Sequence, residues 1–274
     1  MNRADTRLRE RLLEVEAQVL TAGNLARDPL RFPRRYIRVG DIEIAAVLAA
    51  QLAYGRVELF GPVVERILAI QDEWGGPEAY VRAFDDARAA PLGPIVYRWN
   101  RGPDFVLLFS TLRRVLDQHG NVGALFRPGP AATMLGGAID TLTALAPGHT
   151  RGFDTWLAHP RDGSACKRWN MLLRWMVRTG APDLGCWTHL SARDLVIPLD
   201  THVMRVSHFL GLTTRNDAGW KTAAAITDAL RRLDPDDPVR FDFALAHLGI
   251  SGACKGRRDP EVCPGCPLDS VCRA

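Results

Sequence analysis

The sequence has little lysine. Only three of its 35 Lys and Arg residues are lysine. Arginine binds phosphate or carboxylate at least as well as lysine, because its planar guanidinium contacts two oxygens at once and stays protonated. Only lysine can become a neutral amine. The lysine in the stretch GSACKRWN, Lys167, is therefore a candidate for chemistry that arginine does not perform.

Long apolar runs and compositional bias are also missing. No stretch approaches eighteen uncharged apolar residues, which excludes a membrane-spanning helix. The first twenty residues, MNRADTRLRERLLEVEAQVL, are charged and lack an apolar signal region, so we expect a cytoplasmic protein. Hydrophobic residues make up 47% of the chain and charged residues 24%, with no low-complexity tract, which indicates a folded protein rather than a disordered one.

Alternating polar and apolar runs, the signature of half-buried strands, are absent, so the predicted fold class is all-α. Apolar residues instead recur at steps of three and four, for example over residues 42–54, 57–70 and 105–116. Breakers such as WGGPE, PLGP and RPGP separate these helical segments. The length of 274 residues, without an internal repeat, suits two moderate domains.

The charge is mildly basic, with a formal net charge of +4. This permits an anionic partner without requiring one. Basic residues gather in four clusters that are either solvated surface or anion-binding patches: Arg31, Arg34, Arg35 and Arg38; Arg98 and Arg101; Lys167 and Arg168; and Lys255, Arg257 and Arg258.

Four of the six cysteines lie close together at the end of the sequence. They follow the pattern C-x8-C-x2-C-x5-C at Cys254, Cys263, Cys266 and Cys272. Prolines and a glycine between them supply tight turns, so the four thiolates can reach one centre. Such a ligand set suits either an iron–sulfur cluster or tetrahedral zinc.

The segment before these cysteines, an apolar helix followed by Gly249, completes a pattern similar to the C-terminal iron–sulfur loop of the endonuclease III and adenine glycosylase branch of the helix-hairpin-helix DNA glycosylases. The resemblance implies a 4Fe–4S cluster, with zinc as the alternative. The first gap is longer here than is usual in that family. The enlarged loop carries Lys255, Arg257 and Arg258, which the resemblance implies approach DNA phosphates.

The stretch PLDTHVMRV resembles the "VDTHVxRV" segment of the same glycosylases, whose aspartate is the catalytic carboxylate. This implies a catalytic role for Asp200. Breaking an N-glycosidic bond builds positive charge on the sugar, and a fixed carboxylate stabilises that charge or takes a proton from the nucleophile. The alternative is that Asp200 only caps its helix.

The stretch HPRDGSACKRWN is similar to the family's hairpin L-P-G-V-G-x-K-T-A, in which backbone amides hold a DNA phosphate and the lysine attacks C1′ of the sugar. Lys167 takes the position of that lysine, and Ala165 stands where the family has its second glycine. The other reading of Lys167 is a phosphate contact. The residues implied to contact DNA here are Gly163, Ser164, Ala165 and Arg168.

An earlier helix, DIEIAAVLAAQLAYGR, resembles the first core helix of endonuclease III, whose final glutamine fills the gap left by a flipped base. Gln51 takes that position, or else is an ordinary polar residue at a helix end. Further candidates for insertion or base stacking are aromatic: Tyr54, Trp156, Trp169 and Trp187.

Taken together, these segments resemble the helix-hairpin-helix (HhH-GPD) DNA glycosylase superfamily, and several look most like a bacterial branch of it described only as a domain of unknown function. The resemblance implies two helical lobes, a six-helix lobe over 41–199 and a cluster lobe over 1–40 plus 200–274. Lys167 and Asp200 would face each other across the cleft between them.

The function implied is base-excision repair: a glycosylase, with or without abasic-site lyase activity, that flips a damaged or modified base out of double-stranded DNA. We expect a monomer in the cytoplasm, associated with the nucleoid and without membrane contact. Two alternative functions also fit the sequence. One is a protein that binds DNA structure or damage without catalysis, and the other is a zinc-stabilised helical protein without a DNA role.

Overall fold

The structure of the protein is a computed structural model that describes residues 2–250, 254 and 257–273. Helices make up 62% of it and strands 2%, which confirms the all-α class. In the described ranges the strands are β1 (Val96–Tyr97) and β2 (Asn100–Arg101), which form a two-stranded antiparallel hairpin. No helix among these residues combines the length and apolar character that crossing a membrane requires.

The chain divides into two compact units. One comprises Arg27–Asp162, and the other comprises Met1–Ala26 with Gly163–Ala274. These divisions differ from the boundaries at 40 and 199 expected from the sequence. The segment from Gly163 to Leu199 belongs with the C-terminal part of the chain, because its side chains and backbone bond there, as described below for Arg174 and Gly163.

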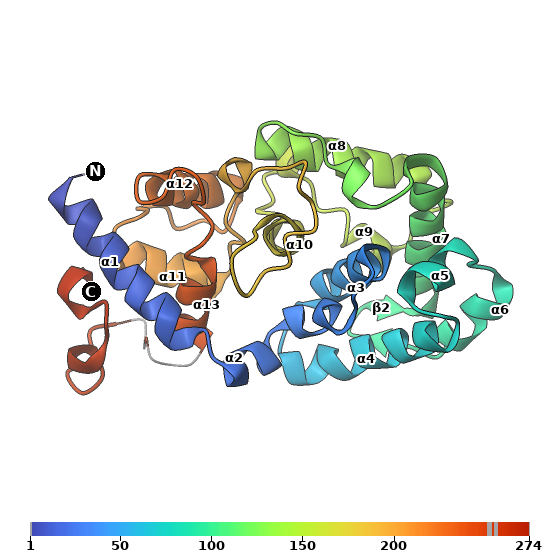
Figure 1. The fold of residues 1–274 in the computed structure, drawn as a ribbon, viewed down its shortest axis with the longest axis horizontal. Helices are drawn as coiled ribbons and strands as arrows, with labels where there is room; N and C mark the ends of the chain where they lie inside the picture. The colour runs from blue at the N-terminus through green and yellow to red at the C-terminus, as the bar shows by residue number, and fades with distance from the viewer. Residues whose placement is uncertain (1, 251–253, 255–256, 274) are drawn as a thin grey trace. The chain divides into compact units, whose positions relative to one another are not determined.

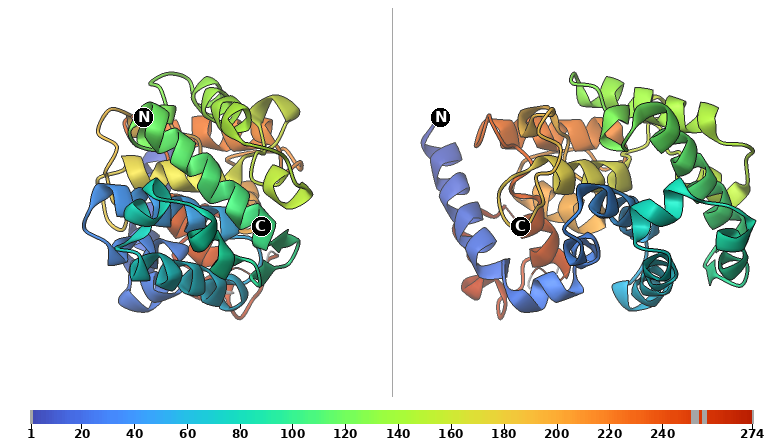
Figure 2. Two further views of the ribbon diagram at one scale, coloured as in Figure 1. Left: turned by 90° about the vertical axis from the view of Figure 1, so that its right-hand side faces the viewer. Right: turned by 45° about the vertical axis from the view of Figure 1, so that its right-hand side comes forward.

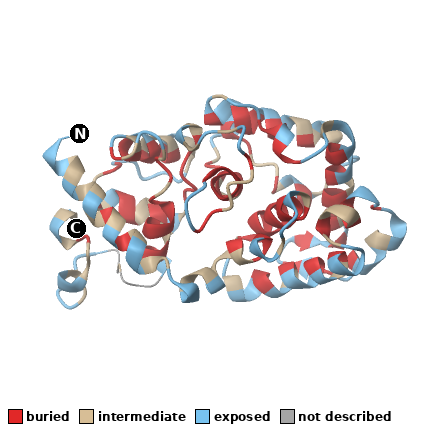
Figure 3. Cartoon of the chain, viewed as in Figure 1, coloured by how far each residue is buried: buried red, intermediate tan, exposed pale blue. Residues whose placement is uncertain are grey.

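The unit of residues 27–162 is built around α3 (Val39–Leu52), in which every residue from Asp41 to Leu52 is buried (Figure 3). A helix enclosed on all sides must be apolar all round, and DIEIAAVLAAQL meets this need except at its few polar positions. One of these, Glu43, accepts hydrogen bonds from the backbone N–H groups of Val122 and Gly123 at 3.0 and 3.1 Å, so its buried carboxylate is satisfied.

The other helices of this unit pack on α3 or on one another. Helices α4 (Val57–Glu73) and α5 (Pro77–Arg82) pack on α3 directly, and α7 (Gly102–His119) packs on α5, α8 and α9. A short α6 (Asp86–Ala89) precedes the β1–β2 hairpin, while α8 (Ala131–Leu145) and α9 (Arg151–Asp154) complete the unit. The path of these helices can be followed in Figure 1.

The other unit combines the N-terminal helix with the C-terminal third of the chain. Its helices are α1 (Arg3–Val19), α10 (Lys167–Val177), α11 (Thr201–Phe209), α12 (Trp220–Arg231) and α13 (Asp242–Ile250); α2 (Ala22–Arg27) lies at the division. Helix α13 packs on both α11 and α1, and α1 runs beside the C-terminal segment (Figures 1 and 2).

Close approach of α11 and α13 depends on Gly249. A Cβ atom at that position would lie 2.6 Å from the Cβ of His202, a distance that the packed helices must relieve by moving apart. Overpacking of this kind typically costs about 1–3 kcal/mol. We expect Gly249→Ala to lower the free energy of unfolding by that amount, as measured in urea.

Gly137 provides the matched control for this prediction. It lies within α8, and a Cβ there would meet no atom within 4 Å. Alanine is the better helix former by about 1 kcal/mol, so Gly137→Ala should be neutral or stabilising. Equal effects of the two substitutions would show that α11 and α13 are not as tightly packed as described.

Candidate active site and cysteine pocket

A tight turn over Gly163–Cys166 leads into α10. Gly163 has φ of +78° and Cys166, at the N-cap, has φ of +47°, so both occupy the left-handed region. Ala165 does not, although the family hairpin has glycine at its position; alanine therefore fits the turn without backbone strain. The backbone N–H of Trp220, the first residue of α12, donates to the Gly163 carbonyl at 2.9 Å. This bond ties the turn to the start of α12.

Lys167 and Asp200 meet next to this turn. Lys167 is the first residue of α10, and its Nζ lies 3.8 Å from Oδ2 of Asp200. The lysine side chain is 33% exposed and the aspartate side chain 24%, so both are sheltered yet accessible. Residues 33 positions apart in the sequence thus form one ion pair.

The two oxygens of Asp200 have different partners. Oδ1 accepts hydrogen bonds from the backbone N–H groups of His202 and Val203, each at 2.9 Å, and so caps α11. Oδ2 is the atom that faces Lys167. Capping and pairing with lysine are therefore compatible, since they use separate oxygens, and the cap fixes the orientation of the carboxylate.

The location of the pair corrects one expectation. Lys167 and Asp200 both belong to the unit that contains Gly163–Ala274, so they do not face each other from two different lobes. The lengthened segment between them, which includes GAPDLGCWTHLSARD, belongs to that unit as well. The site is therefore assembled inside one unit, from the starts of α10 and α11.

A buried network of charges includes two arginines at and directly after the C-terminal half of α10, the helix that begins at Lys167. Arg174, two turns after Lys167 on α10, bonds to Asp242 at the start of α13 and to Asp183 through Nε and Nη2 at 3.2 and 3.0 Å. Arg178 bonds to Asp183 and to Asp237, the latter at 2.8 Å. The side chains of Arg174, Arg178, Asp183 and Asp242 are at most 5% exposed.

Asp242 is the member of the network that bears on the site, and the sequence analysis did not select it. Burial raises its pKa to about 6; Arg174 opposes this shift, the charge of Asp200 adds to it, and the charge of Lys167 also opposes it. Asp242 thus lies within electrostatic range of both candidate catalytic residues. An acidic residue opening the otherwise apolar helix DFALAHLGI was the signal available in the sequence.

Gln51 and three of the aromatic candidates are buried. Gln51 is 1% exposed, and Trp156, Trp169 and Trp187 are 1%, 4% and 2% exposed. A side chain that fills a gap in DNA or stacks on a base must be accessible, so the structure argues against that role for these four. The well-exposed tryptophans are instead Trp74 and Trp99, at 40% and 54%.

The basic residues expected to contact DNA are placed as follows. Arg168 follows Lys167 on α10 and is half-buried, while Arg257 and Arg258 are exposed. Arg258 forms an ion pair with Asp269. Lys255 lies outside the described residues.

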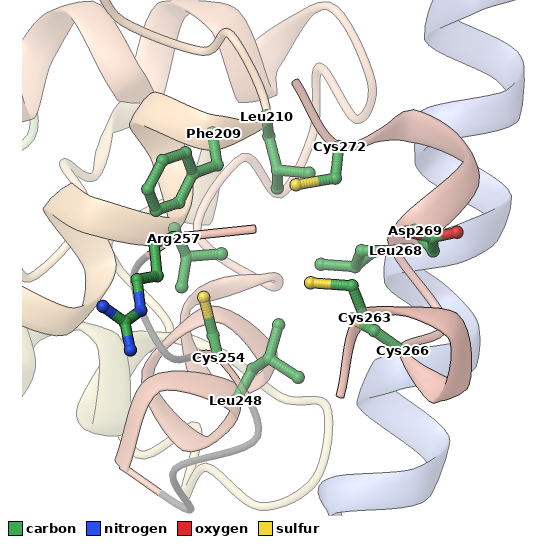
Figure 4. Close-up of a pocket in the computed structure, with 11 residues that line it drawn as sticks. Phe209, Leu210, Leu248, Cys254, Arg257, Cys263, Cys266, Leu268, Asp269 and Cys272 are labelled. Carbon is green, nitrogen blue, oxygen red and sulfur yellow. The ribbon is translucent and has the colours of Figure 1, made fainter. Parts of the chain in front are cut away.

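The four clustered cysteines line one pocket. The pocket wall is shared by Cys254, Cys263, Cys266 and Cys272 with apolar side chains, among them Phe209 of α11, Leu210 directly after α11, and Leu248 of α13. The sulfur atoms of Cys254, Cys263 and Cys272 point into it (Figure 4). The backbone N–H of Asp259 donates to the sulfur of Cys263 at 3.2 Å. The fold thus places cysteines up to 18 positions apart in the sequence at the wall of one pocket.

The thiols influence one another electrostatically. Burial raises the pKa of the Cys266 thiol, a backbone hydrogen bond from Leu268 opposes the shift, and the other three cysteines raise it further. Within the part of the chain that the structure describes, no group of three or more His, Cys, Asp or Glu residues is already arranged to hold a metal ion. The pocket thus gathers the donor set without presenting finished coordination geometry.

The family of the chain follows from a match over residues 28–251 to DUF2400, described as a protein of unknown function. The chain belongs to the DUF2400 family. This corrects the assignment to the HhH-GPD superfamily, because the match is to DUF2400 and no HhH-GPD match accompanies it. No curated protein and no solved structure matches the chain.

The DUF2400 match divides the features described above. It includes Lys167, Asp200 and Asp242, and it ends before the first cysteine of the pocket. The lysine site therefore lies within the family's shared region. The cysteine pocket lies beyond it.

Proposed function

We propose that this protein is a DNA glycosylase with abasic-site lyase activity, acting on a damaged or modified base in double-stranded DNA, with Lys167 as nucleophile and Asp200 as its carboxylate partner. The observation that carries the proposal is the separation of 3.8 Å between Lys167 Nζ and Asp200 Oδ2. A partly sheltered lysine can attack a sugar carbon as the neutral amine, and a fixed carboxylate beside it can accept the proton that the nitrogen then loses.

The proposed reaction begins with the neutral amine of Lys167. Its lone pair forms a bond to C1′ while the bond between C1′ and the base breaks, and the base leaves with that electron pair. The nitrogen then gives a proton to Asp200, which also stabilises the positive charge that develops on the sugar. The nitrogen lone pair next forms the C=N bond while the bond between C1′ and the ring oxygen breaks. That oxygen takes the proton back from Asp200, and the product is an imine protonated on nitrogen. Arginine at position 167 would supply the charge but no nucleophile.

The surroundings of the pair suit a phosphate. The turn over Gly163–Cys166 leads directly into the N-terminal end of α10, and the N-terminal end of a helix favours a bound anion. Gly163, Ser164 and Ala165 would contact a phosphate through the backbone, and Arg168 through its guanidinium. Arg257 and Arg258 would add further phosphate contacts, so affinity should fall steeply with salt.

We propose that the cysteine pocket holds a 4Fe–4S cluster, with zinc as the alternative metal. The donor set supports this, since four cysteines line one pocket together with apolar side chains. Cys254, Cys263, Cys266 and Cys272 would be the ligands. When bound, the group would cross-link the C-terminal segment and so fix the loop that carries Arg257 and Arg258.

The substitution Asp200→Asn separates catalysis from helix capping. Asparagine retains the oxygen that accepts from His202 and Val203 but removes the negative charge beside Lys167. Cleavage of abasic-site duplexes and release of bases from a panel of damaged duplexes should fall by roughly 10²–10⁴-fold. The melting temperature should change little.

Asp85 offers the matched control. Its Oδ1 accepts from the backbone N–H of Arg88 and its Oδ2 pairs with the Arg88 guanidinium, so it combines a helix cap with an ion pair in the unit of residues 27–162. Asp85→Asn should leave activity unchanged. If the natural protein binds these duplexes but processes none of them, the proposal fails in favour of DNA binding without catalysis.

A further inference from the structure

The segments that carry the clustered cysteines are bonded to α11 at two points. Arg205, on α11, donates through Nη2 to the backbone carbonyl of Cys254 at 3.3 Å. The backbone N–H of Arg273, which directly follows Cys272, donates to the carbonyl of Phe209, the last residue of α11, at 2.7 Å. The first of the four cysteines and the neighbour of the last are therefore both held against one helix.

The same helix begins at the candidate active site. Asp200 is its N-cap and accepts hydrogen bonds from the N–H groups of His202 and Val203 through Oδ1. Helix α11 is nine residues long, and a helix this short depends on packing for its stability. Helix α13 supplies one support, and the cysteine segments supply another. The cap that orients Asp200 thus depends on contacts made further along α11.

Arg205 is placed to link the two sites. It lies five residues after Asp200 and bonds to Cys254. Its Nε atom is buried and has no hydrogen-bond partner among the described residues. A buried donor of a charged group without a partner is costly, so the stability of the fold does not by itself account for an arginine here.

The positive charge of Arg205 suits the cysteine pocket. Four thiolates carry more negative charge than a zinc ion or an iron–sulfur core neutralises. A cation bonded beside one of the ligands stabilises such a site and helps to hold the ligand in place.

We propose that Arg205 is a positioning residue that couples the cysteine pocket to Asp200. With the four cysteines bound to metal, Cys254 is fixed, Arg205 transmits this constraint to α11, and α11 holds the Asp200 carboxylate toward Lys167. Arg205 acts through α11 and not on the reacting atoms. The inference rests on the proposed function, both for the metal in the pocket and for the role of Asp200.

Arg205→Gln tests the coupling, and Arg231→Gln is its matched control. Arg231, on α12 of the same unit, also donates through Nη2 to a backbone carbonyl, that of Arg193, at 3.2 Å. Each substitution removes one bond from an arginine to the backbone, but only the bond of Arg205 reaches a cysteine of the cluster. Arg205→Lys, which keeps the charge and loses the planar fork, is a milder variant that should change both measurements below in the same direction and by less.

The first measurement is the release of metal from the full-length protein as purified. The protein is challenged with a chelator, and release is followed by absorbance and metal analysis. Arg205→Gln should lose metal about 10-fold faster than the natural protein, because residues that hold metal ligands in place act on this scale. Arg231→Gln should lose metal at the natural rate.

The second measurement reports on the start of α11 and requires no DNA. Hydrogen exchange of the His202 and Val203 amides, followed by mass spectrometry, shows how often the Asp200 cap opens. Stripping metal from the natural protein should speed this exchange about 10-fold, and so should Arg205→Gln in the loaded protein. Stripping metal from Arg205→Gln should then add little, because the link is already broken. Arg231→Gln should respond to stripping as the natural protein does.

The outcomes separate this inference from the proposed catalysis. If the natural protein traps no DNA but stripping and Arg205→Gln speed exchange of the same amides without adding, the coupling stands and the proposed catalysis fails. If Arg205→Gln retains metal like the natural protein, or if the two changes add, the inference is overturned whether or not the protein acts on DNA. A natural protein purified without metal overturns it together with the metal centre.

Discussion

Lys167→Ala and Lys167→Arg should each abolish the covalent adduct that borohydride traps between the protein and an abasic-site duplex. Alanine removes the amine, and arginine keeps the positive charge but does not form an imine. The adduct is measured as a shifted band on a denaturing gel with labelled DNA. We expect a loss of at least about 10³-fold, because no other group replaces a covalent nucleophile.

These variants should fold normally. The Lys167 side chain is 33% exposed, and an ion pair of this kind contributes at most about 1 kcal/mol. Lys221→Arg is the matched control, since Lys221 is an exposed lysine on α12 of the same unit; it should trap like the natural protein. An adduct that survives Lys167→Arg would show that Lys167 is only a phosphate contact.

The second large effect concerns the cysteine pocket. Cys263→Ser and Cys266→Ser should each remove the brown colour of the purified protein, with its iron and sulfide, because each loses one of four thiolate ligands. Metal binding at such a site contributes directly to folding stability. The melting temperature should therefore fall by roughly 10 °C. Absorption spectra, metal analysis and thermal unfolding provide the measurements.

Cys186 supplies the control, since it is a half-buried cysteine outside the pocket. Cys186→Ser should keep both the colour and the melting temperature. If the natural protein is colourless and binds one zinc per chain, the metal in the pocket is zinc and not an iron–sulfur cluster. A natural protein without bound metal would contradict the metal centre altogether.

The all-α class could be predicted because helical periodicity and the absence of alternating runs are local properties of the sequence. The unit boundaries could not, because they depend on long-range bonds. The segment after Gly163 joins the C-terminal part through Arg174 and Asp242, residues 68 positions apart, and through the backbone bond between Gly163 and Trp220. Periodicity carries no information about such pairings.

Only part of the candidate site could be predicted from the sequence. The sequence predicted that Lys167 and Asp200 belong to one site. In the structure Nζ of Lys167 lies 3.8 Å from Oδ2 of Asp200, and both residues belong to the same unit. The sequence did not select Asp242, because its burial and unpartnered oxygen arise from the packing of α13 on its neighbours. The same reason applies to Gln51 and Trp156, since a side chain's exposure is decided by the whole unit.

The family assignment shows where sequence similarity over short motifs is misleading. Segments such as PLDTHVMRV resemble a glycosylase motif, yet the match over residues 28–251 is to DUF2400. The chemistry proposed for the site therefore depends on the geometry of Lys167 and Asp200 and not on membership of a characterised family.

The central claim is that Lys167 forms the covalent bond to DNA. Its most direct test is to trap the natural protein on an abasic-site duplex with borohydride, digest the adduct, and locate the modified residue by mass spectrometry. We predict a nucleotide remnant on Lys167, in the peptide that contains GSACKRWN. A remnant on Lys221, on the N-terminal amine or on any other residue, or no adduct at all, would contradict it.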